Sequence, residues 1–484
     1  MKYVLSIDQS TQGTKALILD ETGKILCRAD KAHRQIVTEN GWVSHDPEEI
    51  FANTLQVVRD AVTLAGISAA DILCMGISNQ RETTVVWDKH TGKPVCEAIV
   101  WQCGRAKDIC QRILDAGHGE MLRARTGIPA SPYFPAAKMA WILENVPGAK
   151  EKDLCFGTID TWLVYKLTGE YKTDYSNASR TQLFSIVDLR WDPEICRIFG
   201  LKAEDLAQVC DSDGLYGMTD LGGLVEKKIP VYAVMGDSHA ALFGQGCVEP
   251  GMAKATYGTG SSVMMNIGDK PVFSQNGLAT SLAWKRNGVV NYVLEGNINY
   301  TGAVITWLKD DVKLIGTAAE TEALARQANP EDSTYLVPAF TGLGAPYWCN
   351  DARAMIWGMS RVTGKPEIVR AALDCIAYQI TDIVRAMEQD TVKPLASLRT
   401  DGGPTKNGYL MQFQSDILRS CVEVAQVEEL SACGAGFMAG IACGLWSDDI
   451  LHRIERKKIT YTMAESVAQA KYALWKDAVA MVQR

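Results

Sequence analysis

Apolar and polar positions along the first ninety residues predict strands and helices in alternation. The apolar runs at 3–7 and 16–19 flank a polar turn at 8–14, which predicts a β-hairpin with Asp, Ser, Thr and Gly at its tip. A helix is predicted from Pro47 to Leu64, with Asp46 as its N-cap. Further strands are predicted at 72–77 and 83–87. This mixture indicates α/β architecture.

A second half begins in a similar way. A strand predicted at 230–235 ends at Gly236-Asp237, and a turn at 255–262 repeats the Thr, Gly and Ser of the first hairpin. This weak repeat indicates a duplicated unit with a boundary near 244–251. We therefore expect an N-terminal domain at 1–246 and a C-terminal domain at 247–484. In the second half, 366–387 has the spacing of an amphipathic helix, and 430–446 predicts a buried helix too short to span a membrane.

Composition narrows the class of protein. The chain has 484 residues, of which 47% are apolar and 22% charged, so it is globular and long enough for two or three domains. A net charge of −8 disfavours nucleic acid as a partner but allows a small anion held by backbone amides. The first residues do not have the apolar region of a signal peptide, and the 14 Cys include no C-x-x-C pair. We therefore expect free thiols, a cytoplasmic location and no membrane partner.

Three turns have the residue types of a nucleotide site. In the first, Gly13 and the hydroxyls of Thr11 and Thr14 can donate to phosphate, while Asp8 can hold Mg²⁺ through water. An ordinary hairpin turn uses the same residue types, and no P-loop motif is present. The second turn centres on Thr259. The third, Gly402-Gly403 with Asn407 nearby, allows a flat ligand to approach the backbone. Together they favour a nucleotide held between two domains.

Other residues are candidates for binding and activating an acceptor. Asp237 follows a strand, where a carboxylate can take the proton of a hydroxyl that attacks phosphorus; a helix N-cap is the alternative. Arg81-Glu82 can hydrogen-bond to hydroxyls, and Trp101 and Tyr133 can pack on the C–H face of a polyol. A surface charge pair and two core aromatics are the alternative there.

Longer segments carry a resemblance to a known family. The chain resembles the FGGY family of carbohydrate kinases, and within it the glycerol kinases, nearly end to end. The matching segments include 41–47, 78–84, 98–103, 133–145, 156–163, 177–181, 256–260 and 337–348.

The resemblance implies two actin-like (ribonuclease H-like) ATPase domains flanking a cleft, with ATP and Mg²⁺ between them. It implies that Asp237 is the general base and that Asp8 is the acid near the metal. By position, the remaining matches are phosphate contacts at Thr11, Gly13, Thr14 and Thr259, other nucleotide contacts at Gly302, Gly403 and Asn407, and substrate contacts at Arg81, Glu82, Trp101 and Tyr133.

Two departures bear on the substrate. Ser238 stands where glycerol kinases have Gln, and Ser262 where they have Phe. Smaller side chains at these positions suit a longer substrate. We therefore expect ATP-dependent phosphorylation of a terminal hydroxyl of a small polyol, either glycerol or a somewhat longer one. The alternatives are a ketose or other sugar kinase of the same family, and a non-enzymatic actin-like ATPase. The sequence leaves open whether the chain forms a homo-oligomer.

Overall fold

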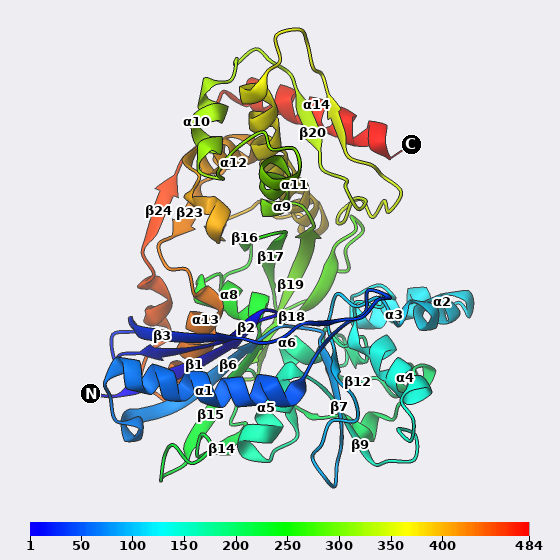
Figure 1. The fold of residues 1–484 in the computed structure, drawn as a ribbon, viewed down its shortest axis with the longest axis vertical. Helices are drawn as coiled ribbons and strands as arrows, with labels where there is room; N and C mark the ends of the chain where they lie inside the picture. The colour runs from blue at the N-terminus through cyan, green and yellow to red at the C-terminus, as the bar shows by residue number, and fades with distance from the viewer. Residues whose placement is uncertain (484) are drawn as a thin grey trace.

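The computed structural model describes residues 1–483 and shows two stacked halves, each built on an open β-sheet (Figure 1). The first sheet has six strands in the order β14-β15-β6-β1-β2-β3. Their bounds are β1 Tyr3–Gln9, β2 Gly13–Leu19, β3 Ile25–Ala32, β6 Ile72–Asn79, β14 Gly217–Thr219 and β15 Ile229–Gly236. The hairpin β1–β2 is antiparallel, as predicted, whereas β1, β6 and β15 run parallel. The carboxyl ends of these three strands therefore meet at one edge.

Helices cover both faces of the first sheet. Alternate residues of β1 point to opposite faces, so Leu5 packs with α1 (Pro47–Ala65) and α5 (Ile159–Thr168). Val4 packs on the other face with α8 (Asp237–Gly244) and α13 (Leu430–Ala442). The Asp46 side chain accepts from the backbone N–H of Glu48, which confirms the predicted cap of α1.

A smaller sheet extends the first half. It has five strands in the order β4-β5-β8-β7-β9. Their bounds are β4 Ile36–Val37, β5 Val43–His45, β7 Thr84–Asp88, β8 Ala98–Ile99 and β9 Leu154–Thr158. The helices around it are α2 Lys107–Asp115, α3 Gly119–Thr126, α4 Pro135–Asn145 and α7 Pro193–Ile198. The short helix α6, Tyr175–Ala178, lies against β15 and β18 instead. The segments that carry Trp101 and Tyr133 lie in this part of the chain.

The second half is built on seven strands in the order β18-β19-β17-β16-β22-β23-β24. Their bounds are β16 Met252–Tyr257, β17 Ser261–Gly268, β18 Ala279–Arg286, β19 Val289–Ile298, β22 Ser397–Asp401, β23 Val422–Ala425 and β24 Arg456–Ile459. A short pair, β20 Tyr335–Val337 and β21 Met355–Trp357, lies farther out. The associated helices are α9 Gly302–Thr306, α10 Glu320–Gln327, α11 Lys365–Thr391, α12 Gly408–Leu418 and α14 Glu465–Val482.

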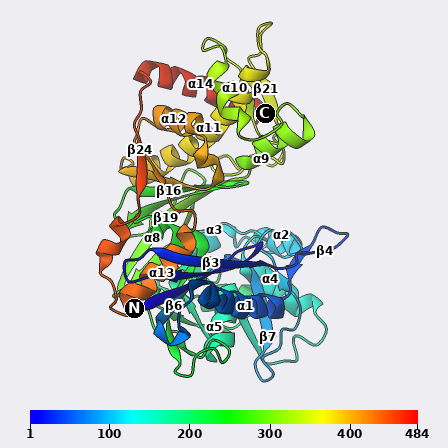
Figure 2. The same ribbon diagram turned by 60° about the vertical axis from the view of Figure 1, so that its left-hand side comes forward.

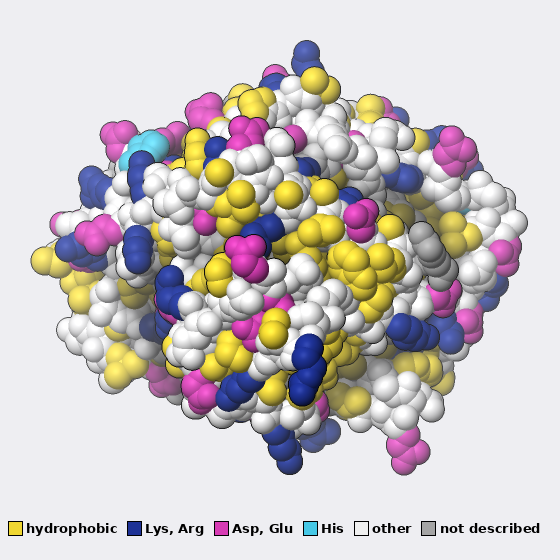
Figure 3. Space-filling model, turned by 90° about the horizontal axis from the view of Figure 1, so that it is seen from above, with side chains coloured by type: hydrophobic (Ala, Val, Ile, Leu, Met, Phe, Trp, Pro, Cys, Tyr) yellow, Lys and Arg dark blue, Asp and Glu magenta, His cyan; other side chains and the backbone are white. Residues whose placement is uncertain are grey.

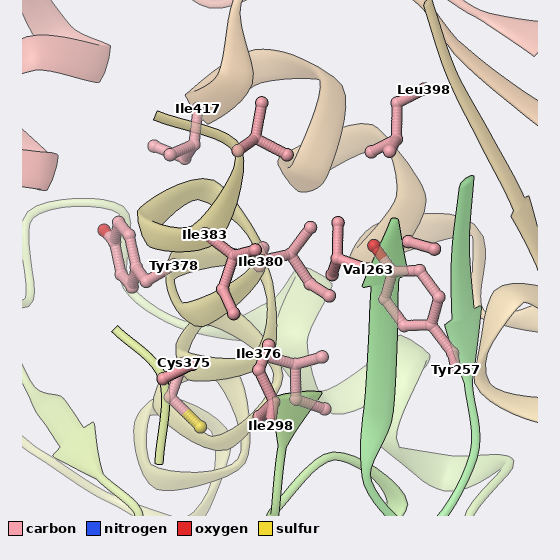
Figure 4. Close-up of a cluster of buried hydrophobic side chains, with 14 of the residues drawn as sticks. Tyr257, Val263, Ile298, Cys375, Ile376, Tyr378, Ile380, Ile383, Leu398 and Ile417 are labelled. Carbon is pink, nitrogen blue, oxygen red and sulfur yellow. The ribbon is translucent and has the colours of Figure 1, made fainter. Parts of the chain in front are cut away.

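Helix α11 forms the core of the second half. The amphipathic helix predicted at 366–387 is confirmed and extends to Thr391. Its apolar side chains, including Ile376 and Ile380, point toward Val263 and Ile298 of the sheet (Figure 4). The opposite face of this sheet is turned toward the first half (Figure 2). One face of the sheet is therefore available to the site between the halves.

Helix α13 joins the two halves. It is the buried helix predicted at 430–446, although it ends at Ala442, and it packs against β1, β6 and β15 of the first sheet. It also lies against α8, and this contact needs glycine, because a Cβ on Gly434 would lie 1.8 Å from the carbonyl oxygen of Ala240. A helix from the second half of the sequence thus completes the core of the first. The division at 246/247 stays a prediction.

One face of the molecule carries mixed charge, and the described helices are not of the membrane-spanning kind. On the face seen from the end that carries α14, basic and acidic side chains are interspersed (Figure 3). Among residues 1–483, no helix combines the length and apolar character needed to cross a membrane.

The close approach of α8 and α13 predicts a large loss of stability for Gly434→Ala. The added methyl group meets backbone, which moves only if the helices separate, so we expect the free energy of unfolding to fall by at least ~2 kcal/mol. Urea unfolding measures this change. Gly104→Ala is the control, because a Cβ there meets no atom within 4 Å. Equal stability of the two variants would contradict this packing argument.

Candidate active site

The site lies where the parallel strands of the first sheet end. Gln9 of β1 pairs with Asn79 of β6, and Gly236 of β15 pairs with the same residue. Arg81 follows β6, and Asp237 follows β15 as the first residue of α8. Gly236 is the N-cap of α8 and Asp237 is the first residue of the helix, so the interpretation of Asp237 as the N-cap is wrong.

Arg81 and Glu82 belong to a buried cluster of charges. Their exposed fractions are 6% and 2%, so the surface-pair interpretation is wrong. Both terminal nitrogens of Arg81 donate to the carboxylate of Glu295, at 2.9 and 2.7 Å. Arg180 lies 3.0 Å from Glu295 through Nη1 and donates through Nε to Glu82 at 2.5 Å. The cluster therefore pairs two guanidinium groups with two carboxylates.

Glu295 and Arg180 are functional candidates that the sequence patterns did not predict. Glu295 is an acid within an apolar strand, Tyr292-Val293-Leu294-Glu295, and a charge in a buried strand signals a partner. Burial would raise the pKa of Glu295, but the positive charges of Arg180 and Arg81 outweigh it and hold that pKa well below its ordinary value. Glu295 is therefore ionised. The identity of its partners, far away in sequence, is given only by the fold.

Asp237 is the partly exposed member of this group. Its side chain keeps 35% of its surface accessible, whereas that of Arg81 keeps 6%. Asp237 Oδ1 lies 3.3 Å from Arg81 Nε and accepts from the backbone N–H of Ser238 at 2.6 Å. Both contacts use Oδ1, so Oδ2 is left to meet a ligand. The carboxylate that a substrate can reach is thus oriented by a buried arginine.

The aromatic candidates lie together beside the first hairpin. The rings of Trp101 and Tyr133 are 5.5 Å apart, and both residues are half-buried. The indole N–H of Trp101 donates to the hydroxyl of Thr11 at 2.9 Å. The buried Lys138 donates to the backbone carbonyls of Tyr133 and Glu82, which ties two of the predicted substrate contacts together.

Asp8 is buried at the end of β1. Its Oδ1 accepts from the hydroxyl of Ser78 at 2.9 Å. Burial raises the pKa of Asp8 to about 6; the charge of Lys15 opposes the rise, and that of Asp237 adds to it. Two carboxylates that interact in this way favour a cation between them, and a carboxylate with retained water is the environment that Mg²⁺ accepts.

The second sheet turns a polar face toward this cluster. Lys254 and Thr256 of β16 lie opposite Met264 and Ser262 of β17, and β19 adds Glu295 and Asn297 on the same face. Ser262 is therefore two residues along the strand from the position opposite Glu295. Its hydroxyl is buried and has no hydrogen-bond partner among the described residues. Ser238, which follows Asp237, is half-buried.

The other nucleotide candidates meet in the second half. Thr259, at the exposed tip of the β16–β17 hairpin, accepts through its carbonyl from the N–H of Ala303 at 3.0 Å, and Gly302 donates to Gly258 at 2.9 Å. A pocket of about 490 Å³ lies nearby, and Gly302, Gly403 and Asn407 all line it. Its apolar walls come from Ile305, Leu373, Ile376 and Leu410.

The polar side-chain groups of two candidates, Asn407 and Thr14, are not free at the surface to meet a ligand. The Asn407 side chain accepts from the N–H of Leu410, as the N-cap of α12, and donates to Thr321 at 3.0 Å. Thr14 is 1% exposed, and its hydroxyl has no partner among the described residues. Gly13 packs so closely on β3 that a Cβ would lie 2.6 Å from the carbonyl of Lys31. The first hairpin therefore presents Thr11 rather than Thr14 to the surface.

The fold and the site define a two-domain phosphotransferase, and comparison with known proteins gives the family. The models for the N-terminal and C-terminal domains of the FGGY family of carbohydrate kinases match residues 3–244 and 253–443. A protein named glycerol kinase 2 from Thermotoga maritima is 47% identical, with 99% of this chain and 98% of the relative covered. The chain belongs to the FGGY family.

Solved structures agree with this assignment. The structure of Plasmodium falciparum glycerol kinase with ADP is 34% identical, with a TM-score of 0.94, and covers 100% of this chain and 99% of its own. A xylulose kinase from Lactobacillus acidophilus, 21% identical and covering 99% and 98%, shares the fold at a TM-score of 0.90. The predicted pair of actin-like domains is confirmed. The chain is an ATP-dependent carbohydrate kinase, so the alternative of a non-enzymatic ATPase is wrong.

The raised pKa of Asp8 predicts how its replacement changes stability with pH. Asp8 binds its proton more tightly in the folded chain than in the unfolded chain, so its contribution to stability is lost as the pH rises from about 4 through about 6. Relative to the wild type, Asp8→Asn should gain about 1–3 kcal/mol over this range. Chemical unfolding in a chelating buffer from pH 4 to 8 measures the difference. A difference independent of pH would contradict this assignment.

Proposed function

We propose that the chain transfers the γ-phosphoryl group of ATP to a terminal hydroxyl of a small polyol, either glycerol or a somewhat longer one. The observation that carries the proposal is the half-exposed Asp237 carboxylate, oriented by Arg81 at the edge where Asp8 also lies. The relatives named glycerol kinase support a polyol as the acceptor. The small side chains at positions 238 and 262 support a longer one.

Asp237 is the proposed general base. As the acceptor oxygen attacks phosphorus, its proton passes to a carboxylate oxygen of Asp237, and Oδ2 has no contact to break first. Glu82, Trp101 and Tyr133 are the proposed contacts for the rest of the acceptor. The aromatic pair would cover its C–H groups, while Arg81 and Glu82 would hydrogen-bond to its hydroxyls.

The residues around Asp8 fit a magnesium ion. Within residues 1–483 no group of three or more acidic, His or Cys side chains is placed to hold a metal, so the protein alone offers one or two carboxylates. Mg²⁺ is held in this way when phosphate oxygens and water supply its other ligands. Asp8 would hold the ion, which when bound neutralises charge on the phosphates.

The nucleotide would span the two halves. We assign its base to the pocket at Gly302, Gly403 and Asn407, whose apolar walls suit a flat ring. The hairpin residues Thr11, Gly13 and Thr14, with Thr259 of the second hairpin, are the proposed phosphate contacts. Because the hydroxyl of Thr14 is buried, backbone N–H groups are the donors we expect from that part of the first hairpin.

Asp237→Asn tests the proposed base. The amide keeps the shape of the side chain but does not accept the proton, so turnover should fall by roughly 10²–10⁴-fold. The dissociation constant of ATP should stay near that of the wild type, because the assigned nucleotide pocket lies on the other half. A coupled ADP-release assay and calorimetric titration measure the two effects. Near-normal turnover in the folded variant would remove Asp237 from the reaction.

Ser238→Gln with Ser262→Phe tests the length of the acceptor. The larger side chains should fill the space beside Asp237 and favour a three-carbon acceptor. Fit on the scale of a methylene group changes selectivity by roughly 10- to 200-fold, so kcat/KM for glycerol relative to xylitol should rise by that factor. A wild type that already prefers glycerol strongly, together with an unchanged ratio in the double variant, would show that other residues set the length.

A further inference from the structure

Glu295 is the point at which the second half of the chain reaches the proposed acceptor site. It is contributed by β19, and its exposed fraction is 2%. Its carboxylate receives two hydrogen bonds from Arg81 and lies 3.0 Å from Arg180. Within this cluster, the Arg81–Glu295 pair is the contact in which two guanidinium nitrogens meet two carboxylate oxygens. This fork-to-fork geometry fixes the plane of a guanidinium group as well as its position.

The two arginines that contact Glu295 also contact residues of the proposed acceptor site, Asp237 and Glu82. Arg81 meets Asp237 through Nε because both of its terminal nitrogens are held by Glu295. Arg180 meets Glu82 through Nε while its Nη1 lies against Glu295. The buried imidazole of His239 also faces the cluster, but burial and the charge of Arg81 keep its pKa well below the ordinary value, so it adds no charge. The two arginines therefore depend on Glu295 for their shared counter-charge.

The strands around Glu295 are fastened to the first half. The N–H of Leu282 in β18 donates to the hydroxyl of Ser179 at 3.1 Å, and Tyr292 donates to the carbonyl of Ile186 at 2.8 Å. The N–H of Ser212 donates to the carbonyl of Lys285 at 2.7 Å. Glu295 is thus held at a fixed place relative to Arg81 by backbone and buried side chains.

We propose that Glu295 is a positioning residue for the acceptor site, which orients Arg81 against Asp237 and Arg180 against Glu82 without contacting the acceptor itself. The inference rests on the proposed polyol kinase activity. Without the Glu295 carboxylate, two buried guanidinium groups lose their common partner, and Arg81 is free to close on both oxygens of Asp237. That movement takes away the oxygen atom that the acceptor hydroxyl needs.

Glu295→Gln provides the test, with Glu295→Asp as the variant that keeps the charge. For Glu295→Gln we expect kcat/KM for the polyol to fall on the order of 10²-fold, with KM for ATP within about twofold of the wild type. Glu295→Asp keeps one charge-assisted contact, so its kcat/KM for the polyol should be at least about tenfold higher than that of Glu295→Gln. Both constants are measured with the polyol that the wild type uses best.

Glu423→Gln is the matched control. Glu423 lies on β23 of the same sheet, is also largely buried, and pairs with Arg399 at 3.2 Å and with Lys458 at 3.6 Å, but it touches no acceptor residue. The Glu423→Gln variant should leave kcat/KM for the polyol unchanged. The inference is overturned if Glu295→Gln folds and retains polyol kcat/KM within about threefold, if Glu423→Gln shows the same loss, or if both Glu295 variants unfold, which would assign Glu295 to the fold. A wild type inactive on every polyol would instead overturn the proposed function itself.

Discussion

The structure depends on a buried cluster of four charged side chains, Arg81, Arg180, Glu82 and Glu295. The free-energy cost of burying charge limits which groups can lie around them. An unpaired buried ion is expensive, and removing one partner of a buried pair leaves the other uncompensated. The cluster meets this constraint with two positive and two negative groups joined by short contacts. Asp237 adds a third carboxylate at the margin, where 35% of its surface is accessible. The proposed general base is thus the one charged group of this cluster that is not fully enclosed.

This arrangement requires both halves of the chain. Arg81 and Asp237 come from the ends of parallel strands of the first sheet, and Arg180 follows helix α6, whereas Glu295 comes from the second sheet. Helix α13 returns from the second half to cover the first sheet and lies against α8, the helix that starts at Asp237. The same contacts that join the halves therefore hold the proposed acceptor site. The pocket that we assign to the nucleotide base, lined by α9–α12 and the Gly403 turn, belongs to the second half alone.

Local sequence patterns predicted individual helices and strands better than they predicted contacts between residues far apart in the sequence. The hairpin at 3–19, the Asp46 cap and the helix at 366–387 depend on neighbours within a few residues, and each was confirmed. Glu295 was missed because its partner Arg81 is 214 residues away, a distance over which periodicity carries no signal. The crossing of α13 was missed for the same reason. Asn407 was predicted to contact the nucleotide base, but its side chain caps α12. Whether an Asn side chain caps a helix depends on the local backbone conformation.

At the centre of this description of the protein is phosphoryl transfer from ATP to a terminal hydroxyl of a polyol. The most direct measurement is ADP release by the wild type with ATP and Mg²⁺, with and without glycerol, erythritol, threitol, xylitol, arabinitol, dihydroxyacetone or xylulose, with the product identified by phosphorus NMR. We expect that at least one polyol stimulates ADP release and gains one phosphate ester on a terminal carbon for each ADP formed. Stimulation by the ketoses alone, or ADP release that no acceptor changes and that yields only free phosphate, would contradict it.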